Sequence, residues 1–288
     1  MKTVGLFLAT NIAVLMVLSF TLQVFDVREM SGLLILALII GMGGSFISLA
    51  LSKWIAKIST GAQVIEEPSN RAEEWLVETV RRQASAAGIG MPEVAIYDSP
   101  DINAFATGMN RNNALVAVSS GLLHAMEQDE IEAVLAHEIS HVANGDMVTL
   151  ALIQGVVNVF VIVIARIIGM FVDRLVFKNE RGFGIGYYVT SYLAEICLAI
   201  LANIIVMWFS RQREFHADAG SARIEGANKM IRALQRLQMA HTGELPEQLS
   251  AFGIHGSKGT SLVQHLFMTH PPLEDRIEAL QQNRYLSS

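Results

Sequence analysis

Long stretches without charged residues alternate with polar stretches along this chain, and the first two lie close to the N-terminus. They cover residues 3–25 and 31–52. A helix needs about 20 mainly apolar residues, at a rise of about 1.5 Å each, to cross the hydrocarbon core of a bilayer. Residues 26–30, which link the two stretches, are too few to form a domain. The pattern therefore predicts a transmembrane helical hairpin whose two ends lie on the same side of the membrane.

Two more apolar stretches follow Asp146. One continues past Arg166 to Val172, and the other runs from about residue 189 to 209 and contains Glu195. They predict a second hairpin, which either spans the bilayer or lies against the folded domain. In a spanning hairpin, Arg166 and Glu195 would reach a similar depth near the outer face, where they could form an ion pair. In the alternative, each side chain extends separately to the interface.

The polar stretch between the two hairpins has the pattern of a folded aqueous domain. Asn70 and Glu73 form a capping pair in front of a helical pattern that ends before Gly88. Turn-rich sequences separate short strands in the next part, and Asn144 and Gly145 end a second helix. Strands are expected at residues 94–97, 103–107 and 115–118, and helices at residues 128–143, 222–240, 260–268 and 273–285.

Composition and charge agree with a membrane protein, because 52% of the residues are hydrophobic and only 17% are charged. The net charge of -6 and the absence of a long basic run argue against nucleic acid as a partner. The single cysteine, Cys197, excludes an internal disulfide. Lys2, Lys53 and Lys57 flank the first hairpin, whereas its turn holds only Arg28, so the positive-inside rule places both ends in the cytoplasm.

Candidate chemistry lies in the segment HEISH, residues 137–141, on the helix expected at residues 128–143. Residues four apart on an α-helix project within about 40° of each other, so His137 and His141 share a face. Their imidazoles can both reach one zinc ion, while Glu138 flanks them and can act as the general base. A match of five residues also arises by chance, so the third ligand is the feature that discriminates.

A catalytic zinc site needs three protein ligands and one open position. Glu214, in SRQREFHADAGSA, is the best distant candidate, and Asp218 lies four residues later on the same helical face. One carboxylate would bind the metal, and the other would accept an N–H from a ligating histidine. His216 projects about 200° away from Glu214, so it and the carboxylate face cannot both meet the metal. The carboxylate face is preferred.

The sequence resembles the HtpX family of membrane zinc metalloproteases, which are relatives of the CAAX prenyl proteases. The likeness extends almost end to end and is strongest in PDINAFATG, AHEISHVANGDM, SRQREFHADAGSA and MTHPPLEDRIEAL. It implies one Zn²⁺ per chain on His137, His141 and Glu214, with Glu138 as the base. It also implies a multi-pass protein of the bacterial inner membrane with its active site in the cytoplasm. Such proteases cleave misfolded or damaged membrane proteins under stress, alongside the protease FtsH.

Two further features belong to the candidate site. His270 stands in THPP, where two prolines fix the chain, and it is either a residue for oxyanion stabilisation or resting-state metal binding, or a plain turn residue. The strand expected at residues 103–107 is either an ordinary core strand or an edge that an extended substrate segment joins. The family resemblance favours the edge, which would use Asn103, Ala104, Phe105 and Ala106.

Together these patterns predict an α+β membrane protein that is mainly helical, with about four transmembrane helices and a zincin-like cytoplasmic domain with a small sheet. A transmembrane hairpin is expected at residues 1–56 and a second apolar hairpin at residues 148–210. The peptidase domain is divided between residues 57–147, with the HExxH helix, and residues 211–288, with the third ligand.

The predicted activity is that of a zinc endopeptidase acting on cytosol-exposed segments of polypeptides, in particular membrane proteins. An intramembrane peptidase is an alternative, but four carboxylates lead into the metal helix and are costly within hydrocarbon. These are Glu127, Asp129, Glu130 and Glu132. A non-catalytic membrane scaffold with a structural metal site is the other alternative, although structural zinc sites usually contain cysteine.

Overall fold

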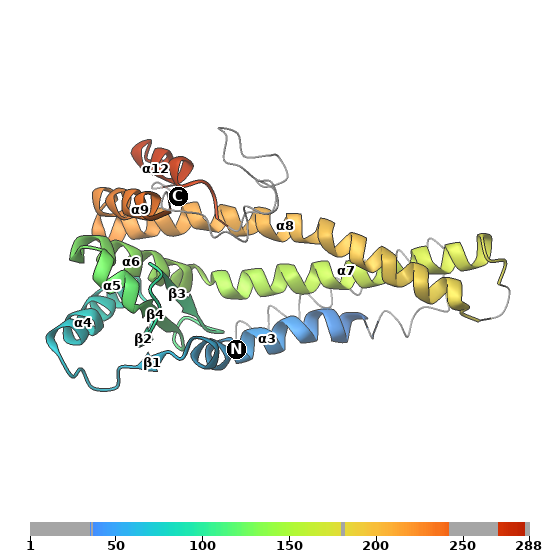
Figure 1. The fold of residues 1–288 in the computed structure, drawn as a ribbon, viewed down its shortest axis with the longest axis horizontal. Helices are drawn as coiled ribbons and strands as arrows, with labels where there is room; N and C mark the ends of the chain where they lie inside the picture. The colour runs from blue at the N-terminus through green and yellow to red at the C-terminus, as the bar shows by residue number, and fades with distance from the viewer. Residues whose placement is uncertain (1–34, 36, 180–181, 242–269, 286–288) are drawn as a thin grey trace. The chain divides into compact units, whose positions relative to one another are not determined.

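A computed structural model describes residues 35, 37–179, 182–241 and 270–285. Three of the described helical segments are long and apolar enough to cross a membrane, namely Ile39–Thr60, Asp146–Leu175 and Ile185–Glu225 (Figure 1). The mainly helical membrane architecture is thereby confirmed. The apolar stretch at residues 3–25 and the helix expected at residues 260–268 lie outside the described residues.

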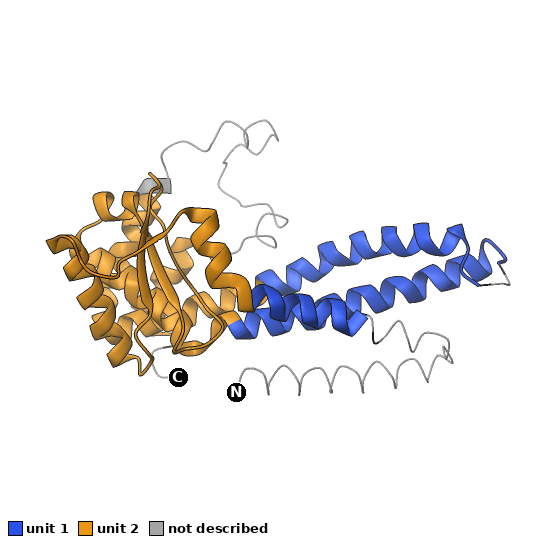
Figure 2. Cartoon of the chain, turned by 90° about the horizontal axis from the view of Figure 1, so that it is seen from below, with its two compact units in different colours: residues 1–49, 148–207 blue, residues 50–147, 208–288 orange. Residues whose placement is uncertain are grey.

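The chain divides into two compact units, each built from two separate stretches of sequence (Figure 2). Unit 1 comprises residues 1–49 and 148–207, and unit 2 comprises residues 50–147 and 208–288. Three helices pass from one unit into the other, namely α3 (Gly44–Thr60), α7 (Asp146–Leu175) and α8 (Ile185–Glu225). All the strands described below belong to unit 2.

The sheet of unit 2 has four strands in the order β1-β2-β4-β3. The strands are β1 (Gln63–Val64), β2 (Glu93–Tyr97), β3 (Ala104–Thr107) and β4 (Leu115–Ser119). The central pair β2 and β4 is parallel, while β1 and β3 pair antiparallel with their neighbours. The three strands expected from the sequence are confirmed, whereas β1 was missed because two residues carry no recognisable period. Within the described sheet, β3 is an edge strand.

Helices α4 (Arg71–Ala86) and α6 (Gln128–Asn144) pack against the sheet and enclose the main core. The expected capping pair starts α4, because Asn70 Oδ1 accepts the backbone N–H of Glu73 at 2.9 Å. The Glu73 carboxylate in turn accepts the backbone N–H of Ser69 at 2.8 Å. At the end of α6, Gly145 adopts a left-handed conformation with φ of 74°, which ends the helix one residue later than expected.

Two sequence expectations about the C-terminal helices were wrong in their boundaries. The pattern at residues 222–240 does not form one helix, because Gly226, with φ of 94°, separates α8 from α9 (Ala227–His241). The pattern at residues 273–285 ends early, at Gln281 in α12 (Leu273–Gln281). Positive φ angles at Asn283 and Tyr285 are incompatible with a continuing right-handed helix.

Unit 1 contains most of α7 together with the N-terminal part of α8. Nη2 of Arg166 lies 3.2 Å from Oε2 of Glu195, so the ion pair is present and the alternative of two separate side chains is not. Close packing accompanies it, since a Cβ at Gly169 would lie 1.9 Å from Oγ of Ser191. The two helices therefore approach at a glycine next to a paired charge, as helices do in an apolar surrounding.

Candidate metal centre

The centre of the site is a pair of histidines on α6. His137 and His141 lie one turn apart with their Nε2 atoms 3.1 Å from each other and their rings at 88°. Both side chains are almost fully buried. The helix is held in place by Leu135 and Ile139, which are fully buried in the core, and this packing fixes the direction of the imidazoles.

Glu214 on α8 completes the set of three ligand atoms. Its Oε2 lies 3.5 Å from Nε2 of His137, and its Oε1 lies 3.4 Å from Nε2 of His141. Bonds of about 2.0–2.2 Å to the corners of a tetrahedron place ligand atoms about 3.3–3.6 Å apart. The two separations that involve Glu214 lie in this range and the 3.1 Å between the two Nε2 atoms is slightly shorter, so the three side chains are close enough together to hold one zinc ion.

The polar atoms of Glu214 give a second indication of a metal. Oε2 is buried, and none of the described residues offers it a hydrogen bond aligned along an N–H direction. Nδ1 of His270 at 2.8 Å and Nη1 of Arg276 at 3.5 Å are near it. A buried carboxylate oxygen without an aligned donor is costly, and coordination of a cation would remove that cost. The donor set of two imidazoles and a carboxylate fits Zn²⁺.

Each of the two histidines also has a carboxylate next to its Nδ1 atom, in addition to Glu214 near its Nε2 atom. Oδ2 of Asp146 lies 2.6 Å from Nδ1 of His141, and Oδ1 of Asp218 lies 2.9 Å from Nδ1 of His137. The Asp218 contact is within hydrogen-bond distance, although the carboxylate lies off the direction of the ring N–H. Carboxylates at Nδ1 orient the rings and leave both Nε2 atoms available for a metal.

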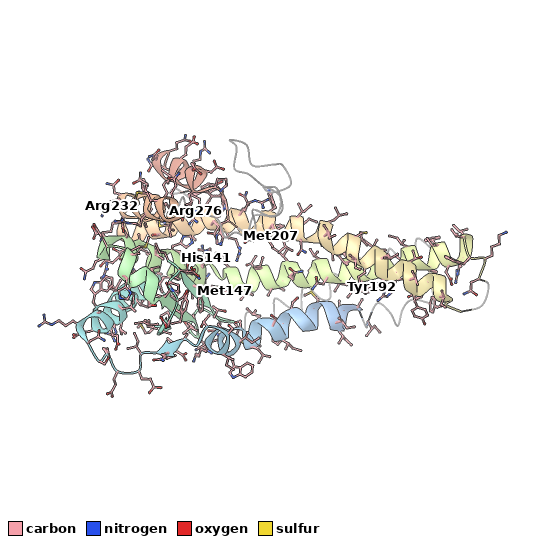
Figure 3. The ribbon with its side chains drawn as sticks, in the orientation of Figure 1. His141, Met147, Tyr192, Met207, Arg232 and Arg276 are labelled. Atoms are coloured by element: carbon pink, nitrogen blue, oxygen red, sulfur yellow. The ribbon has the colours of Figure 1, made fainter. Side chains whose placement is uncertain are left out.

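Arg276 on α12 connects the C-terminal segment to this centre, and Figure 3 marks it together with His141. Its Nε and Nη2 donate to the two oxygens of Asp218 at 2.8 and 2.6 Å, a bidentate pair. Burial lowers the pKa of Arg276, but the carboxylate of Asp218 outweighs burial and raises it. The guanidinium compensates the negative charge that Asp218 and Glu214 bring into the interior.

Sequence reasoning missed Asp146 and Arg276. Asp146 follows the glycine that ends α6, so its direction could not be read from the helical period. Arg276 did leave a signal, because it shares one face of α12 with Leu273, Ile277 and Leu280, where a charge is unexpected. A charged residue within an apolar stripe indicates a buried partner.

Glu138 lies beside the histidines and is partly exposed. Burial raises the pKa of its carboxyl, while the neighbouring His137 and His141 lower it by a smaller amount. The backbone N–H of Ala106, in the edge strand β3, also lowers this pKa, by less than the histidines do. The position suits a group that accepts and returns a proton next to a bound peptide.

The other histidines considered from the sequence occupy different places. His270 is 63% exposed and contacts Glu214, so it lies at the mouth of the centre. His216 is exposed and its ring lies 5.0 Å from that of Tyr285, outside the ligand set.

Burial lowers the pKa of His141, but Asp146 and Glu214 outweigh burial and raise it to about 10. Metal binding at neutral pH would therefore displace a proton from His141.

Comparisons with known proteins agree with this geometry. The family model described as Peptidase family M48 matches residues 70–284. A Protease HtpX homolog of Nitrosomonas europaea is 64% identical over 98% of this chain and 99% of its own length. Protease HtpX of Thioalkalivibrio sulfidiphilus is 60% identical over the same shares.

A solved structure shares the fold. The crystal structure of S. mikatae Ste24p matches 91% of this chain with a TM-score of 0.62 at 19% sequence identity. The chain spans 61% of the length of that protein.

Proposed function

The chain belongs to peptidase family M48 and is a membrane-anchored metalloprotease, and from this premise we propose that it cleaves cytosol-exposed segments of misfolded or damaged proteins in the bacterial inner membrane. The observation that carries the proposal is the buried cluster of His137, His141 and Glu214 in a chain with three candidate membrane spans. One zinc ion per chain would be held by these three side chains.

Each residue around the cluster has a role in the proposed reaction. A bound zinc ion supplies polarisation of the scissile carbonyl and of a water molecule. Glu138 removes the proton of that water at its carboxylate and later donates it to the leaving amine. Asp146 and Asp218 keep the histidine rings oriented, and His270 stands where it can donate a hydrogen bond to the developing oxyanion.

The edge strand β3 supports the binding of an extended substrate. The backbone C=O of Asn103 accepts the N–H of Ser119 at 2.9 Å, so Asn103 faces β4. The backbone N–H and C=O groups of successive strand residues point alternately to the two sides of the strand. Those of Phe105 therefore also point to β4, whereas those of Ala104 and Ala106 point away from it. The N–H of Ala106 lies near enough to Glu138 to lower the pKa of its carboxyl, and α6 packs on β3, so the free edge lies beside the candidate base. Pairing through the backbone tolerates many sequences, as quality control requires.

The experiment compares the wild-type chain with Glu138→Gln in detergent, with casein as the first substrate. We expect the variant to bind one equivalent of zinc and to lose about 10²–10⁴-fold in the cleavage rate. Equal cleavage by the two proteins would overturn the mechanism. Zinc content measured on Glu214→Gln tests the third ligand, since full retention of zinc would remove Glu214 from the set.

The quality-control task requires a separate test. One membrane protein, reconstituted in a native form and in a heat-damaged form, is offered to the protease in the same vesicles. We expect the damaged form to be cut at least about tenfold faster, because unfolded cytosolic segments can pair with an edge strand. Equal rates would exclude selection of damaged proteins. Co-purification of Glu138→Gln with an FtsH-type protease tests the partnership that the family resemblance implies.

A further inference from the structure

The last turns of α3, which belong to unit 2, carry an exposed apolar ridge. Leu51, Trp54, Ile55 and Ile58 are 44, 63, 45 and 63% exposed. Their spacing places them on one face of the helix. Scattered apolar residues are common on protein surfaces, but a continuous ridge with a tryptophan at its centre indicates an interaction surface.

The opposite face of the same turns is attached to the folded part of unit 2. Nζ of Lys53 and of Lys57 lie 2.8 and 2.6 Å from the carboxylate of Glu93, the first residue of β2. Lys53 also donates to Oδ1 of Asn113 at 2.7 Å. Because Lys53 and Lys57 project about 110–150° from the centre of the ridge, these contacts keep the ridge turned away from the sheet.

A similar signal appears on α8 where this helix enters unit 2. Trp208 and Phe209 are 50 and 38% exposed. They end the apolar part of the helix, since Arg211 and Arg213 follow them. Tryptophan at the end of an apolar run is typical of the headgroup region of a membrane, where amphipathic rings are favoured.

We propose that Trp54, Ile58 and Trp208 lie in the headgroup region of the lipid bilayer and hold unit 2 against the membrane surface. Both α3 and α8 belong to candidate membrane spans, so the ridge continues directly from segments that are long and apolar enough to cross a bilayer. This continuity, together with the two tryptophans, identifies the occupant as lipid and not as another protein.

The consequence for the metal centre follows along α8. Glu214 stands six residues after Trp208, which corresponds to about 9 Å of helix. An extended chain covers that distance in about three residues. The protease then acts on juxtamembrane segments, cutting within the first few residues outside the bilayer. This step rests on the proposed function, whereas the lipid contact of unit 2 does not.

The lipid contact is tested by fluorescence of the full-length chain in vesicles of phosphatidylethanolamine and phosphatidylglycerol. Three variants each retain one tryptophan, at position 54, 75 or 208, and the others are replaced by phenylalanine. Trp75 is the control because it is partly buried against the core in α4. Lipids brominated near the headgroup should quench Trp54 and Trp208 at least threefold more strongly than Trp75. Quenching equal to that of Trp75 would overturn the proposal, whether another chain segment or a second copy covers the ridge.

The juxtamembrane preference is tested with substrates that contain one transmembrane segment and one cleavable sequence. That sequence is placed about 5, 15 or 30 residues from the membrane in otherwise identical chains. Each added residue increases the maximum distance between the cleavable sequence and the membrane by roughly 3.3 Å. We expect the rate to fall at least tenfold from the nearest to the farthest position in vesicles. Equal rates at the three positions would overturn the preference. Casein, assayed in detergent, reports the proposed peptidase activity separately, so loss of casein cleavage identifies failure of the proposed function itself.

A double variant links the two tests. Trp54→Ser with Ile58→Ser alters neither the ligands nor the substrate strand, so cleavage of casein in detergent should stay within twofold of wild type. In vesicles, the same variant should lose most of its preference for the nearest cleavage position. An unchanged preference would show that the ridge does not set the distance from the membrane.

Discussion

Oδ2 of Asp146 lies 2.6 Å from Nδ1 of His141, which makes this carboxylate the closest polar partner of that histidine among the described residues. We expect Asp146→Ala to weaken zinc binding about 10–100-fold, because the ring loses the acceptor that orients it. Asp146→Asn keeps an acceptor oxygen and should lose less. Competition against a chelator of known affinity measures both. Zinc binding by Asp146→Ala as tight as that of wild type would exclude the orienting role.

Arg276 provides a prediction about stability. Its removal leaves the buried carboxylate of Asp218 without its bidentate guanidinium partner, so Arg276→Met should lower the free energy of unfolding of the metal-free protein by about 3–5 kcal/mol. Zinc would replace part of the missing positive charge, so the zinc-loaded protein should lose less. Chemical denaturation with and without zinc measures the difference.

The conservative variant Arg276→Lys separates charge from geometry. Lysine keeps the charge but cannot form the bidentate pair with Asp218, so an intermediate loss is expected. Equal destabilisation of the metal-free and zinc-loaded forms of Arg276→Met would contradict compensation between the guanidinium and the metal.

The edge strand gives a prediction about catalysis. The backbone N–H of Ala104 points away from β4. Ala104→Pro therefore removes a donor that a substrate would use and leaves the pairing between β3 and β4 intact. Loss of one backbone hydrogen bond corresponds to about 3–10-fold in the cleavage rate. Zinc content and the thermal midpoint should stay close to wild type.

A neighbouring substitution serves as the contrast. Phe105 faces β4, so Phe105→Pro interrupts the sheet and should lower the thermal midpoint clearly. If Ala104→Pro cleaves casein at the wild-type rate while it stays folded, substrate pairing along β3 is excluded.

The sequence predicted those parts of the site that a regular period determines. His137 with His141, and Glu214 with Asp218, are four apart on helices, so their shared faces follow from geometry before any tertiary contact is known. Asp146 could not be placed because Gly145 turns the chain with φ of 74° between it and α6. Arg276 reaches Asp218 from 58 residues away, a contact that depends on how α12 packs.

The same distinction holds for the fold. Strands β2, β3 and β4 have enough residues to show their pattern, while β1 has two and was missed. The break at Gly226 within a continuous helical pattern was also missed, since glycine is tolerated inside helices and its φ of 94° is set by the fold. The order of strands, which places β3 at the edge, is a property of tertiary packing that local patterns do not contain.

Gly220 provides the last prediction, because it is a residue of α8 that lies against α6 near the metal centre. A Cβ at this position would lie 2.3 Å from Oγ and 2.6 Å from Cβ of Ser140. Gly220→Ala should therefore push α8 away from α6 and lower the free energy of unfolding by about 1–3 kcal/mol. It should also weaken zinc binding, since Glu214 on α8 must reach the histidines of α6.

The partner residue makes this prediction specific. Ser140→Gly removes both clashing atoms, so the double variant Gly220→Ala with Ser140→Gly should regain most of the lost zinc affinity, whereas Ser140→Ala keeps the Cβ and should rescue less. Gly44→Ala is the control, because a Cβ there meets nothing within 4 Å and alanine stabilises helices by roughly 0.5–1 kcal/mol relative to glycine. A double-mutant cycle on zinc affinity measures the coupling. Additive effects of the two substitutions would show that the approach of the two helices at Gly220 does not position Glu214.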